Sequence, residues 1–370
     1  MLHEHVVGWD LGGAHVKAAS LNVDGAVQHV IQRPCPLWRG LPQLRITLRS
    51  MLEDMQIERA AHAVTMTGEL VDIFPDRTHG VSELLGVMVQ QFGETPLLVY
   101  AGRNGFVSPG SVAAQAAQVA SANWLAAATL VANRMSEGLY IDVGSTTTDI
   151  VSFSHGKVHA RGFTDHARLT QDELIYTGVT RTPVMAITDH AASAGGWTSL
   201  MAEQFATMAD VYRLTGDLPA YADTLPSADG GDKTEAASAR RLARMLGVDT
   251  SMATEQDAAD NDDWVRVAEY IAECQLMRLR TALETHLSRG VFGARAPLVG
   301  AGIGRFLVRA LAVRLQRPFV DFGTFFPPEP VAGGAAIADC APAVAIALLA
   351  SNEFAVKQRE PYDRAEVGVE

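Results

Sequence analysis

Three short apolar segments open the chain, separated by polar or glycine-containing turns. Residues 6–11, 16–21 and 26–31 have the length and the apolar character of β-strands. Glycine stands at position 12 in the first turn, and an Asn-Val-Asp-Gly turn follows at 22–25. We therefore predict a β-meander with a glycine turn at its first corner.

Helical and extended patterns then alternate. Residues 41–55 and 81–91 have a helical periodicity, whereas 63–66 and 96–100 are apolar runs of strand length. This alternation indicates an α/β domain. Alanine dominates residues 111–133, but interspersed glutamine and asparagine favour a buried helix over a membrane span.

The opening strand-turn-strand pattern occurs a second time near the middle of the chain. Residues 139–153 repeat residues 7–21, with apolar strands on both sides of a turn. When the aspartates that end the two first strands, Asp10 and Asp142, are superposed, the glycines of the two turns coincide. An internal duplication is the simplest interpretation.

After residue 161 the chain is helical for a long stretch. Helices are predicted at 201–214, 237–246 and 264–287, with a loop rich in Asp, Gly and Pro at 216–234. From residue 297 a strand, a helix, a strand and a closing alanine-rich helix follow.

The length of the chain agrees with two domains. A chain of 370 residues is longer than one hydrophobic core usually supports. We expect a first lobe over residues 1–135 and a second lobe over 136–370, with a helical subdomain inserted at about 165–295.

Charge and composition exclude several partners. A net charge of -12 argues against nucleic acid or an anionic membrane as the main partner. Met1 leads almost directly into an apolar strand, so we expect no signal peptide and a cytoplasmic protein. The three cysteines lack zinc-site spacing and suit reduced core thiols. A homodimer is the default expectation.

The two glycine turns carry the main chemical signal. In such a turn, backbone N–H groups surround a corner where glycine lets a phosphate oxygen approach the main chain. One copy alone is usually only a hairpin, but two facing copies form a cleft for a polyphosphate. The predicted diphosphate ligands are Asp10, Gly12, Gly13, Ala14, His15, Lys17, Gly144, Ser145, Thr146, Thr147 and Thr148.

A third glycine-rich turn, residues 300–304, lies between a strand and a helix. Gly302 there could contact the diphosphate or only permit close packing. Asp10 and Asp142 are the predicted ligands of a Mg²⁺ ion. The three turns in this order resemble the actin, sugar-kinase and Hsp70 superfamily (ASKHA, ribonuclease H-like), which has a two-lobed α/β fold with duplicated phosphate-binding hairpins.

More specific motifs narrow this resemblance. Three motifs resemble those of the hydantoinase/oxoprolinase family: GGAHVKAA (12–19), TMTGEL (65–70) and IDVGSTTTD (141–149). Three further motifs resemble one branch of this family, the tetrahydromethanopterin-linked one-carbon transfer proteins. These motifs are YTGVTRTPV (176–184), ATMADVYR (206–213) and SARRLARM (238–245). The archaeal members of that branch form the furylmethyl-phenyl ether of methanofuran.

The branch implies an alkyl transfer in methanofuran or methylofuran biosynthesis. The phenol oxygen of a glutamylated tyramine or tyrosine would attack the methylene of an aminomethylfuryl-methyl diphosphate and expel pyrophosphate. The furan ring stabilises a cationic methylene, so the main tasks are to neutralise the diphosphate and to place the phenol. Lys17, the turns and Mg²⁺ near Asp10 or Asp142 are expected to perform the first task.

Five further side chains are assigned to the substrate or to proton transfer. Glu69 is the predicted base or a clamp on the substrate ammonium, although a first-turn helix glutamate is equally compatible. Arg103 and Arg181 could bind a carboxylate or phosphate, with solvated arginines as the commoner alternative. Tyr176 and Asp210 complete the set, and Asp210 could instead form a surface salt bridge.

Two other functions remain open at this point. An ATP-dependent kinase or amidohydrolase fits both the fold and the family resemblance, and ATP would then occupy the cradle. A nucleotide-binding regulatory or assembly protein of the actin kind is the third possibility. The sequence identifies neither an adenine pocket nor a polymerisation surface.

Overall fold

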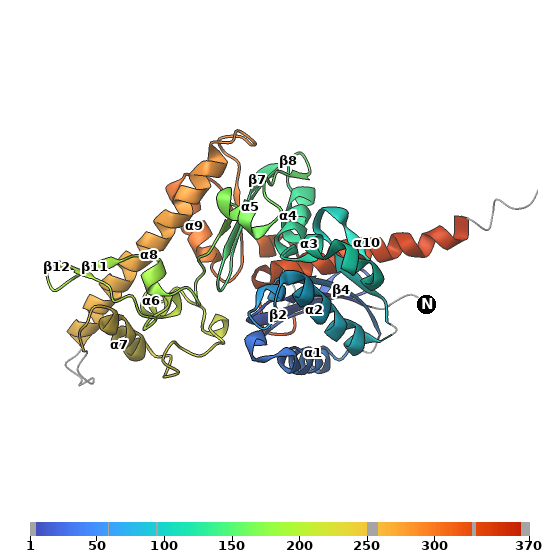
Figure 1. Ribbon diagram of the computed structural model, residues 1–370. Coiled ribbons are helices and arrows are strands. Elements are labelled where there is room, and N and C mark those ends of the chain that lie inside the picture. The colour runs from blue at the N-terminus through green and yellow to red at the C-terminus, as the bar shows by residue number, and fades with distance from the viewer. Residues whose placement is uncertain (1–4, 58, 94, 250–257, 328–330, 364–370) are drawn as a thin grey trace, which may run out of the picture.

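The first lobe is built around a six-stranded mixed sheet in the order β3-β2-β1-β4-β5-β6. The computed structural model describes residues 5–57, 59–93, 95–249, 258–327 and 331–363 (Figure 1). The strands are β1 (His5–Leu11), β2 (His15–Leu21), β3 (Val27–Pro34), β4 (Ala60–Met66), β5 (Leu97–Tyr100) and β6 (Phe106–Val107). β1 pairs antiparallel with β2, and β2 pairs antiparallel with β3, which confirms the predicted meander. β1 also pairs parallel with β4.

Two helices pack against this sheet. They are α1 (Leu41–Met55) and α2 (Arg77–Phe92). Leu44 and Leu48 of α1, four residues apart, lie on one face of the helix and are buried. They share a hydrophobic core with Trp9 of β1. The apolar face that the sequence periodicity predicts for this helix is therefore the face that covers the sheet.

The second lobe repeats this topology. Its strands are β7 (Glu137–Val143), β8 (Thr148–Ser154), β9 (Lys157–Val158), β10 (Leu174–Ile175), β13 (Leu298–Ala301) and β14 (Phe319–Asp321). β7 pairs antiparallel with β8 and parallel with β13, as β1 does with β2 and β4. Asp142 lies opposite Asp149, as Asp10 lies opposite Lys17. The predicted duplication is confirmed in strand order and in register.

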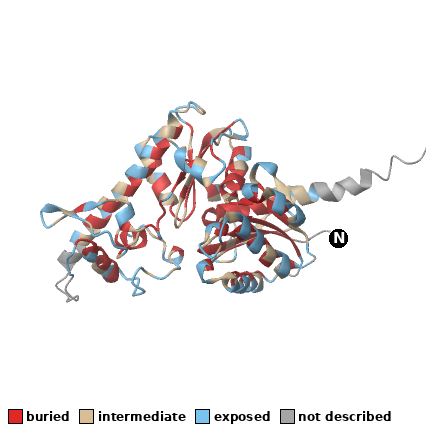
Figure 2. Cartoon of the chain, in the orientation of Figure 1, coloured by how far each residue is buried: buried red, intermediate tan, exposed pale blue. Residues whose placement is uncertain are grey.

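Each lobe contributes a helix to the other. α4 (Asn123–Arg134), which follows the first sheet, packs on β7, β8 and β9, whereas α10 (Ala341–Asp363) at the end of the chain packs on β1, β2 and β4. Buried residues of both helices form one core between the sheets (Figure 2). The approach is close at Gly8, where an alanine Cβ would lie 2.3 Å from the Ala343 carbonyl oxygen.

Because of this close approach, adding a single methyl group at Gly8 should destabilise the fold. Gly8→Ala is expected to lower the free energy of unfolding by about 1–3 kcal/mol, because α10 must move away from β1. Gly86→Ala in α2 is the matched control, since a Cβ there meets no atom within 4 Å. Denaturant unfolding measures both variants. Equal unfolding free energies for the two would contradict the packing of α10.

Among the described residues, one segment, Ile337–Ala355, has the length and apolar composition of a membrane span. Most of it is buried where α10 packs on the first sheet. Such burial is typical of the core helix of a globular protein.

The alanine-rich stretch 111–133 is not one helix, contrary to the prediction. A short helix α3 (Ala116–Val119) and α4 are separated by a break, where Ser121 adopts a φ of 50°. Ala120 forms a parallel bridge with Met66 at the end of β4. The break therefore places Ser121 beside the carboxyl end of β4.

A subdomain lies between β8 and β13. Its elements are α5 (Asp165–Thr170), β11 (His190–Ser193), β12 (Gly196–Ser199), α6 (Met208–Leu214), α7 (Glu235–Met245) and α8 (Ala258–Leu287). It is not purely helical, because β11 and β12 form a hairpin. The helix predicted from residue 201 begins at Met208, where Thr207 and Asp210 form a capping box.

Candidate functional site

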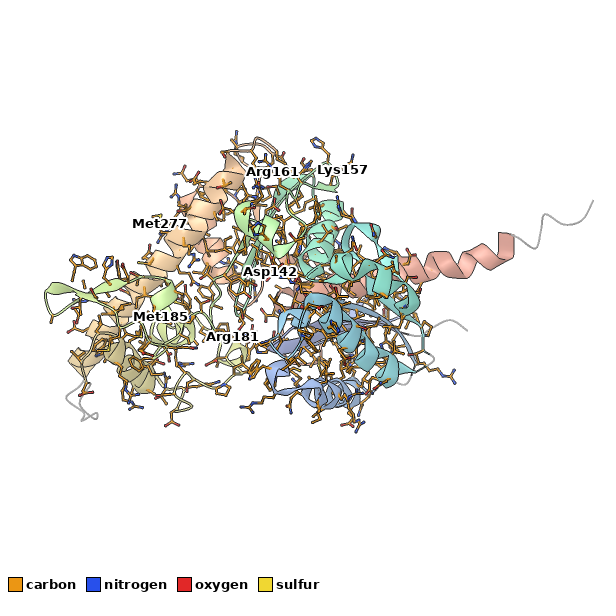
Figure 3. The ribbon with its side chains drawn as sticks, viewed as in Figure 1. Asp142, Lys157, Arg161, Arg181, Met185 and Met277 are labelled. Carbon is orange, nitrogen blue, oxygen red and sulfur yellow. The ribbon has the colours of Figure 1, made fainter. Side chains whose placement is uncertain are left out.

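A cavity of about 270 Å³ lies between the two lobes. Both glycine turns form its wall, the first at 12–15 and the second at 144–147. Asp142 lies near the middle of the molecule and Arg181 lies on the subdomain side (Figure 3). The predicted site residues that line the cavity are Asp10, Gly12, Gly13, Ala14, His15, Lys17, Asp142, Gly144, Ser145, Thr146, Thr147, Tyr176 and Arg181.

The two turns close in the same way. The Gly12 N–H donates to the His15 carbonyl at 2.9 Å, and the Gly144 N–H donates to the Thr147 carbonyl at 2.9 Å. Each turn is therefore a tight backbone loop that faces the cavity from one lobe. Backbone loops of this kind are suited to anions.

The motif 176–184 braces the second turn. The Val179 N–H donates to the Gly144 carbonyl at 3.0 Å. A Cβ at Gly178 would lie 2.5 Å from the Thr146 amide nitrogen, so only glycine permits this approach. The shape of the second turn therefore depends on a segment that follows β10.

Lys17 is a half-buried cation that lines this cavity. It lies opposite Asp10 in the β1–β2 ladder. Burial lowers its pKa, but the neighbouring Cys340, Asp142 and Asp10 raise it by more, so the pKa is raised overall. The ammonium group therefore stays protonated beside the turns.

Asp10 and Asp142 occupy matching positions near the ends of β1 and β7. Burial raises the pKa of Asp142 to about 7, against the opposing charge of Lys17, and also raises the pKa of Asp10. The Tyr140 hydroxyl donates to Asp142 Oδ2 at 3.0 Å, and the Asn123 amide donates to Asp10 Oδ1 at 3.3 Å. Both carboxylates are thus fixed at one cavity.

These carboxylates fit a Mg²⁺ ion that binds together with a phosphate. Mg²⁺ usually keeps several waters and takes one or two carboxylates plus phosphate oxygens. Four aspartates and three Lys or Arg side chains line the cavity, so a bound polyanion calls for further positive charge. In the part of the chain that the structure describes, no three His, Cys, Asp or Glu side chains gather into a complete metal site.

Glu69 lies behind the cavity wall. It belongs to a single 3-10 turn (Gly68–Leu70) after β4 and is 1% exposed. Ser121, which lines the cavity, donates to Glu69 Oε1 at 2.8 Å. Burial raises the pKa of Glu69 to about 7, although this hydrogen bond opposes the shift. The predicted base is therefore connected to the cavity through Ser121.

Several cavity residues were missed by sequence reasoning. The Arg168 guanidinium lies 3.9 Å from the centre of the Trp124 ring and donates to Asp149 Oδ1 at 2.8 Å. Asp165 also lines the cavity and accepts from Arg77 of the first lobe at 2.6 Å. These cavity residues come from α4, β8 and α5, and no local spacing marks the three segments as a group.

His15 joins the first turn to the subdomain. Its Nε2 lies 2.7 Å from Thr224 Oγ1 in the loop 216–234. Burial, followed by the charges of Lys17 and Arg181, lowers the pKa of His15 to about 3, so the ring is neutral. The polar loop that the sequence analysis singled out therefore reaches the first turn across the cleft.

Two predicted diphosphate ligands, Thr148 and Gly302, are not part of the cavity lining. The Thr148 hydroxyl is buried and donates to the Thr177 carbonyl at 2.7 Å. The Gly302 N–H donates to the Ala338 carbonyl at 2.7 Å, and a Cβ at Gly302 would lie 2.4 Å from Asp142 Oδ1. Gly302, with a φ of 78°, thus permits close packing against Asp142.

Arg103 and Asp210 also lie outside the cavity lining. The Arg103 guanidinium lies 4.1 Å from the centre of the Phe163 ring. Asp210 is 1% exposed and accepts from Arg241 Nε and from Ser238 Oγ, each at 2.8 Å. Asp210 is therefore neither a substrate contact nor a surface salt bridge: it caps α6 and ties α6 to α7.

Two curated relatives share part of this sequence. A protein of Methanocaldococcus jannaschii is 28% identical over 256 residues, which are 69% of this chain and 75% of that protein. A protein of Methanococcus vannielii is 30% identical over 108 residues, which are 29% of this chain and 48% of that protein. Both are named (4-{4-[2-(gamma-L-glutamylamino)ethyl]phenoxymethyl}furan-2-yl)methanamine synthase.

Structural comparison and family matching agree with the architecture. A nucleotide-free acetone carboxylase superposes with a TM-score of 0.52 at 10% identity, covering 83% of this chain and 66% of that chain. With the duplicated strand order, this confirms the predicted actin/sugar-kinase/Hsp70-like fold. The hydantoinase/oxoprolinase family matches residues 60–342, well over half of the chain. The chain therefore belongs to the hydantoinase/oxoprolinase family.

Proposed function

We propose that this protein is a transferase of methanofuran or methylofuran biosynthesis. It joins an aminomethylfuryl-methyl diphosphate to the phenol oxygen of a glutamylated tyramine or tyrosine and releases pyrophosphate. The name of the two relatives describes a phenoxymethyl-furan ether that carries a methanamine group. Such an ether is the product that this transfer would yield.

One observation carries the proposal: two glycine turns face one cavity that also holds Lys17, Asp10 and Asp142. Backbone loops and a protonated lysine stabilise a polyanion at one end of a substrate. This arrangement suits a diphosphate leaving group, because the negative charge of that group grows as the bond to carbon breaks.

The transfer breaks the bond between the furylmethyl carbon and a diphosphate oxygen while the phenol oxygen bonds to the same carbon. Positive charge on that carbon is shared with the furan ring. Lys17, Arg181 and the two turns neutralise the charge on the leaving diphosphate. Mg²⁺ held by Asp10 and Asp142 supplies additional positive charge there when it is bound.

The remainder of the cavity suits the organic part of the substrates. Trp124 offers an aromatic surface beside Arg168. Asp165 supplies a carboxylate for the ammonium group of the furylmethylamine. The cavity thus combines groups that stabilise an anion with an aromatic ring and a carboxylate that suit a furylmethylamine.

A reconstituted reaction tests the proposal. The protein is incubated with the furylmethyl diphosphate, the phenolic acceptor and Mg²⁺, and the ether is identified by mass spectrometry. Absence of the ether would reject the proposed reaction. A phosphorylated or ring-opened product formed with ATP would instead favour the kinase or amidohydrolase.

A further inference from the structure

We propose that Ser121 and Glu69 form a proton relay, in which Ser121 Oγ takes the proton of the acceptor phenol and passes its own proton to Glu69. This inference rests on the proposed function and assigns the base that the transfer requires. Ser121 is the group that contacts the phenol, and Glu69 is the final proton acceptor behind it.

The positions of the two side chains support this order. Ser121 lines the cavity, whereas Glu69 is 1% exposed and does not. The Ser121 hydroxyl donates to Glu69 Oε1 at 2.8 Å. A proton that leaves a ligand in the cavity can therefore reach the buried carboxylate through one hydroxyl group, which is within the geometric reach of general base catalysis.

The backbone around the pair is unusually constrained. Ser121 has a φ of 50°, an uncommon value for a residue other than glycine, and the Met66–Ala120 bridge fixes it beside β4. On the other side, α2 presses on Glu69 at Gly80, where a Cβ would lie 2.4 Å from the Glu69 carbonyl oxygen. Strain and close packing of this kind persist where a functional geometry must be held.

The carboxyl group of Glu69 makes fewer hydrogen bonds than a purely structural role would require. Its Oε2 is buried and has no hydrogen-bond partner. A buried carboxyl oxygen without a partner destabilises the fold, so a purely structural role would favour glutamine or an apolar residue. The charged groups that face it are Arg77 of α2 and Asp165 of α5, which act in opposite directions on its protonation.

The proposed step is balanced in atoms and charge. The phenol O–H bond breaks, its proton bonds to Ser121 Oγ, and the original Ser121 proton bonds to Glu69 Oε1. Glu69 becomes a neutral carboxylic acid, and the phenol oxygen uses its electron pair to attack the furylmethyl carbon. The diphosphate leaves with the electrons of the broken carbon–oxygen bond.

Asp142 is the competing carboxylate, and its surroundings assign it to the other end of the site. Its Oδ2 accepts from the Tyr140 hydroxyl at 3.0 Å, and Gly302 packs closely against its Oδ1. The positive charge of Lys17 favours the ionised form of Asp142. These contacts suit a fixed ligand near the diphosphate and leave proton transfer to Ser121 and Glu69.

The test measures kcat of the wild type and of relay variants with a series of acceptor phenols that differ in acidity. Glu69→Gln and Ser121→Ala are expected to lower kcat by about 10²-fold with an ordinary phenol, a typical contribution of general base catalysis. With a polyfluorinated phenol, already ionised at the assay pH, the same variants should approach wild-type turnover. Glu83→Gln on the exposed face of α2 is the control and should resemble the wild type throughout.

The pH profile gives a second readout. Burial raises the pKa of both Glu69 and Asp142 to about 7, so wild-type kcat/KM should fall below that pH through both carboxyl groups, and Glu69→Gln should make the decline shallower. Glu69→Gln should unfold at the same or a higher temperature at pH 8. This follows because a raised carboxyl pKa means that the wild type loses stability as the pH rises toward 7.

Distinct outcomes would overturn the relay and the function. A loss of activity in Glu69→Gln that is the same for all phenols, or a decline at low pH that is as steep in the variant as in the wild type, would reject the relay while the ether synthase stands. If the wild-type protein forms no ether with any phenol, the proposed function and the relay are both rejected.

Discussion

Replacing Lys17 by methionine is expected to lower kcat for pyrophosphate release by about 10³-fold. This is the upper end of the loss, about 10²- to 10³-fold, that follows removal of one preorganised group which stabilises a developing anion. Methionine keeps most of the side-chain volume but removes the positive charge that interacts with Asp10 and Asp142. The remaining aspartates would then weaken binding of the diphosphate and destabilise the negative charge that grows on it as the bond to carbon breaks. Turnover at saturating substrate measures the effect.

Lys157→Met is the matched control for this variant. Lys157 is exposed on β9 and lies well away from Asp142 (Figure 3), so its replacement should leave turnover unchanged. Thermal unfolding must accompany the assay, because removing one partner of buried charges also destabilises a fold. A folded Lys17→Met protein with wild-type turnover would remove Lys17 from the reaction.

The second large effect is expected from Gly178→Ala, which changes no residue of the cavity lining. The new Cβ would lie 2.5 Å from both the Ser145 carbonyl carbon and the Thr146 nitrogen, so the second turn must shift. A displacement of about 1 Å at a reacting group can reduce the rate about 10²-fold, and we expect a loss of this size in kcat/KM. Calorimetric titration should also show weaker binding of pyrophosphate.

Gly110→Ala provides the comparison, because a Cβ at Gly110 meets no atom within 4 Å. It should bind pyrophosphate and turn over like the wild type. If Gly178→Ala is equally unaffected, the second turn does not need the support of residues 176–184 and the account of that motif is wrong.

The sequence was sufficient for the elements whose pattern is local. Both hairpins follow from apolar strands interrupted by glycine corners, and the repeat of Asp10 at Asp142 led to the two related lobes that the strand order confirms. The matching pairing register of the two hairpins could also be predicted from the sequence, because Lys17 follows Asp10 at the same spacing as Asp149 follows Asp142.

The cavity wall beyond the turns depends on contacts between distant segments. Alanine suits both a continuous and a broken helix, so composition cannot reveal the break at Ser121, which follows from the bridge between Ala120 and Met66. For Asp210 a local signal did exist: Thr207 followed three residues later by an acidic side chain is a helix-capping pattern. That pattern would have favoured a structural role for Asp210.

The central claim is that the two turns hold a diphosphate that leaves as the aryl ether forms. The most direct test measures pyrophosphate and ether in the same reaction mixture over time, with and without the phenolic acceptor. We predict equal amounts of the two products and no pyrophosphate above the uncatalysed rate without the phenol. Pyrophosphate release that is independent of the phenol, or the absence of the ether, would contradict the claim.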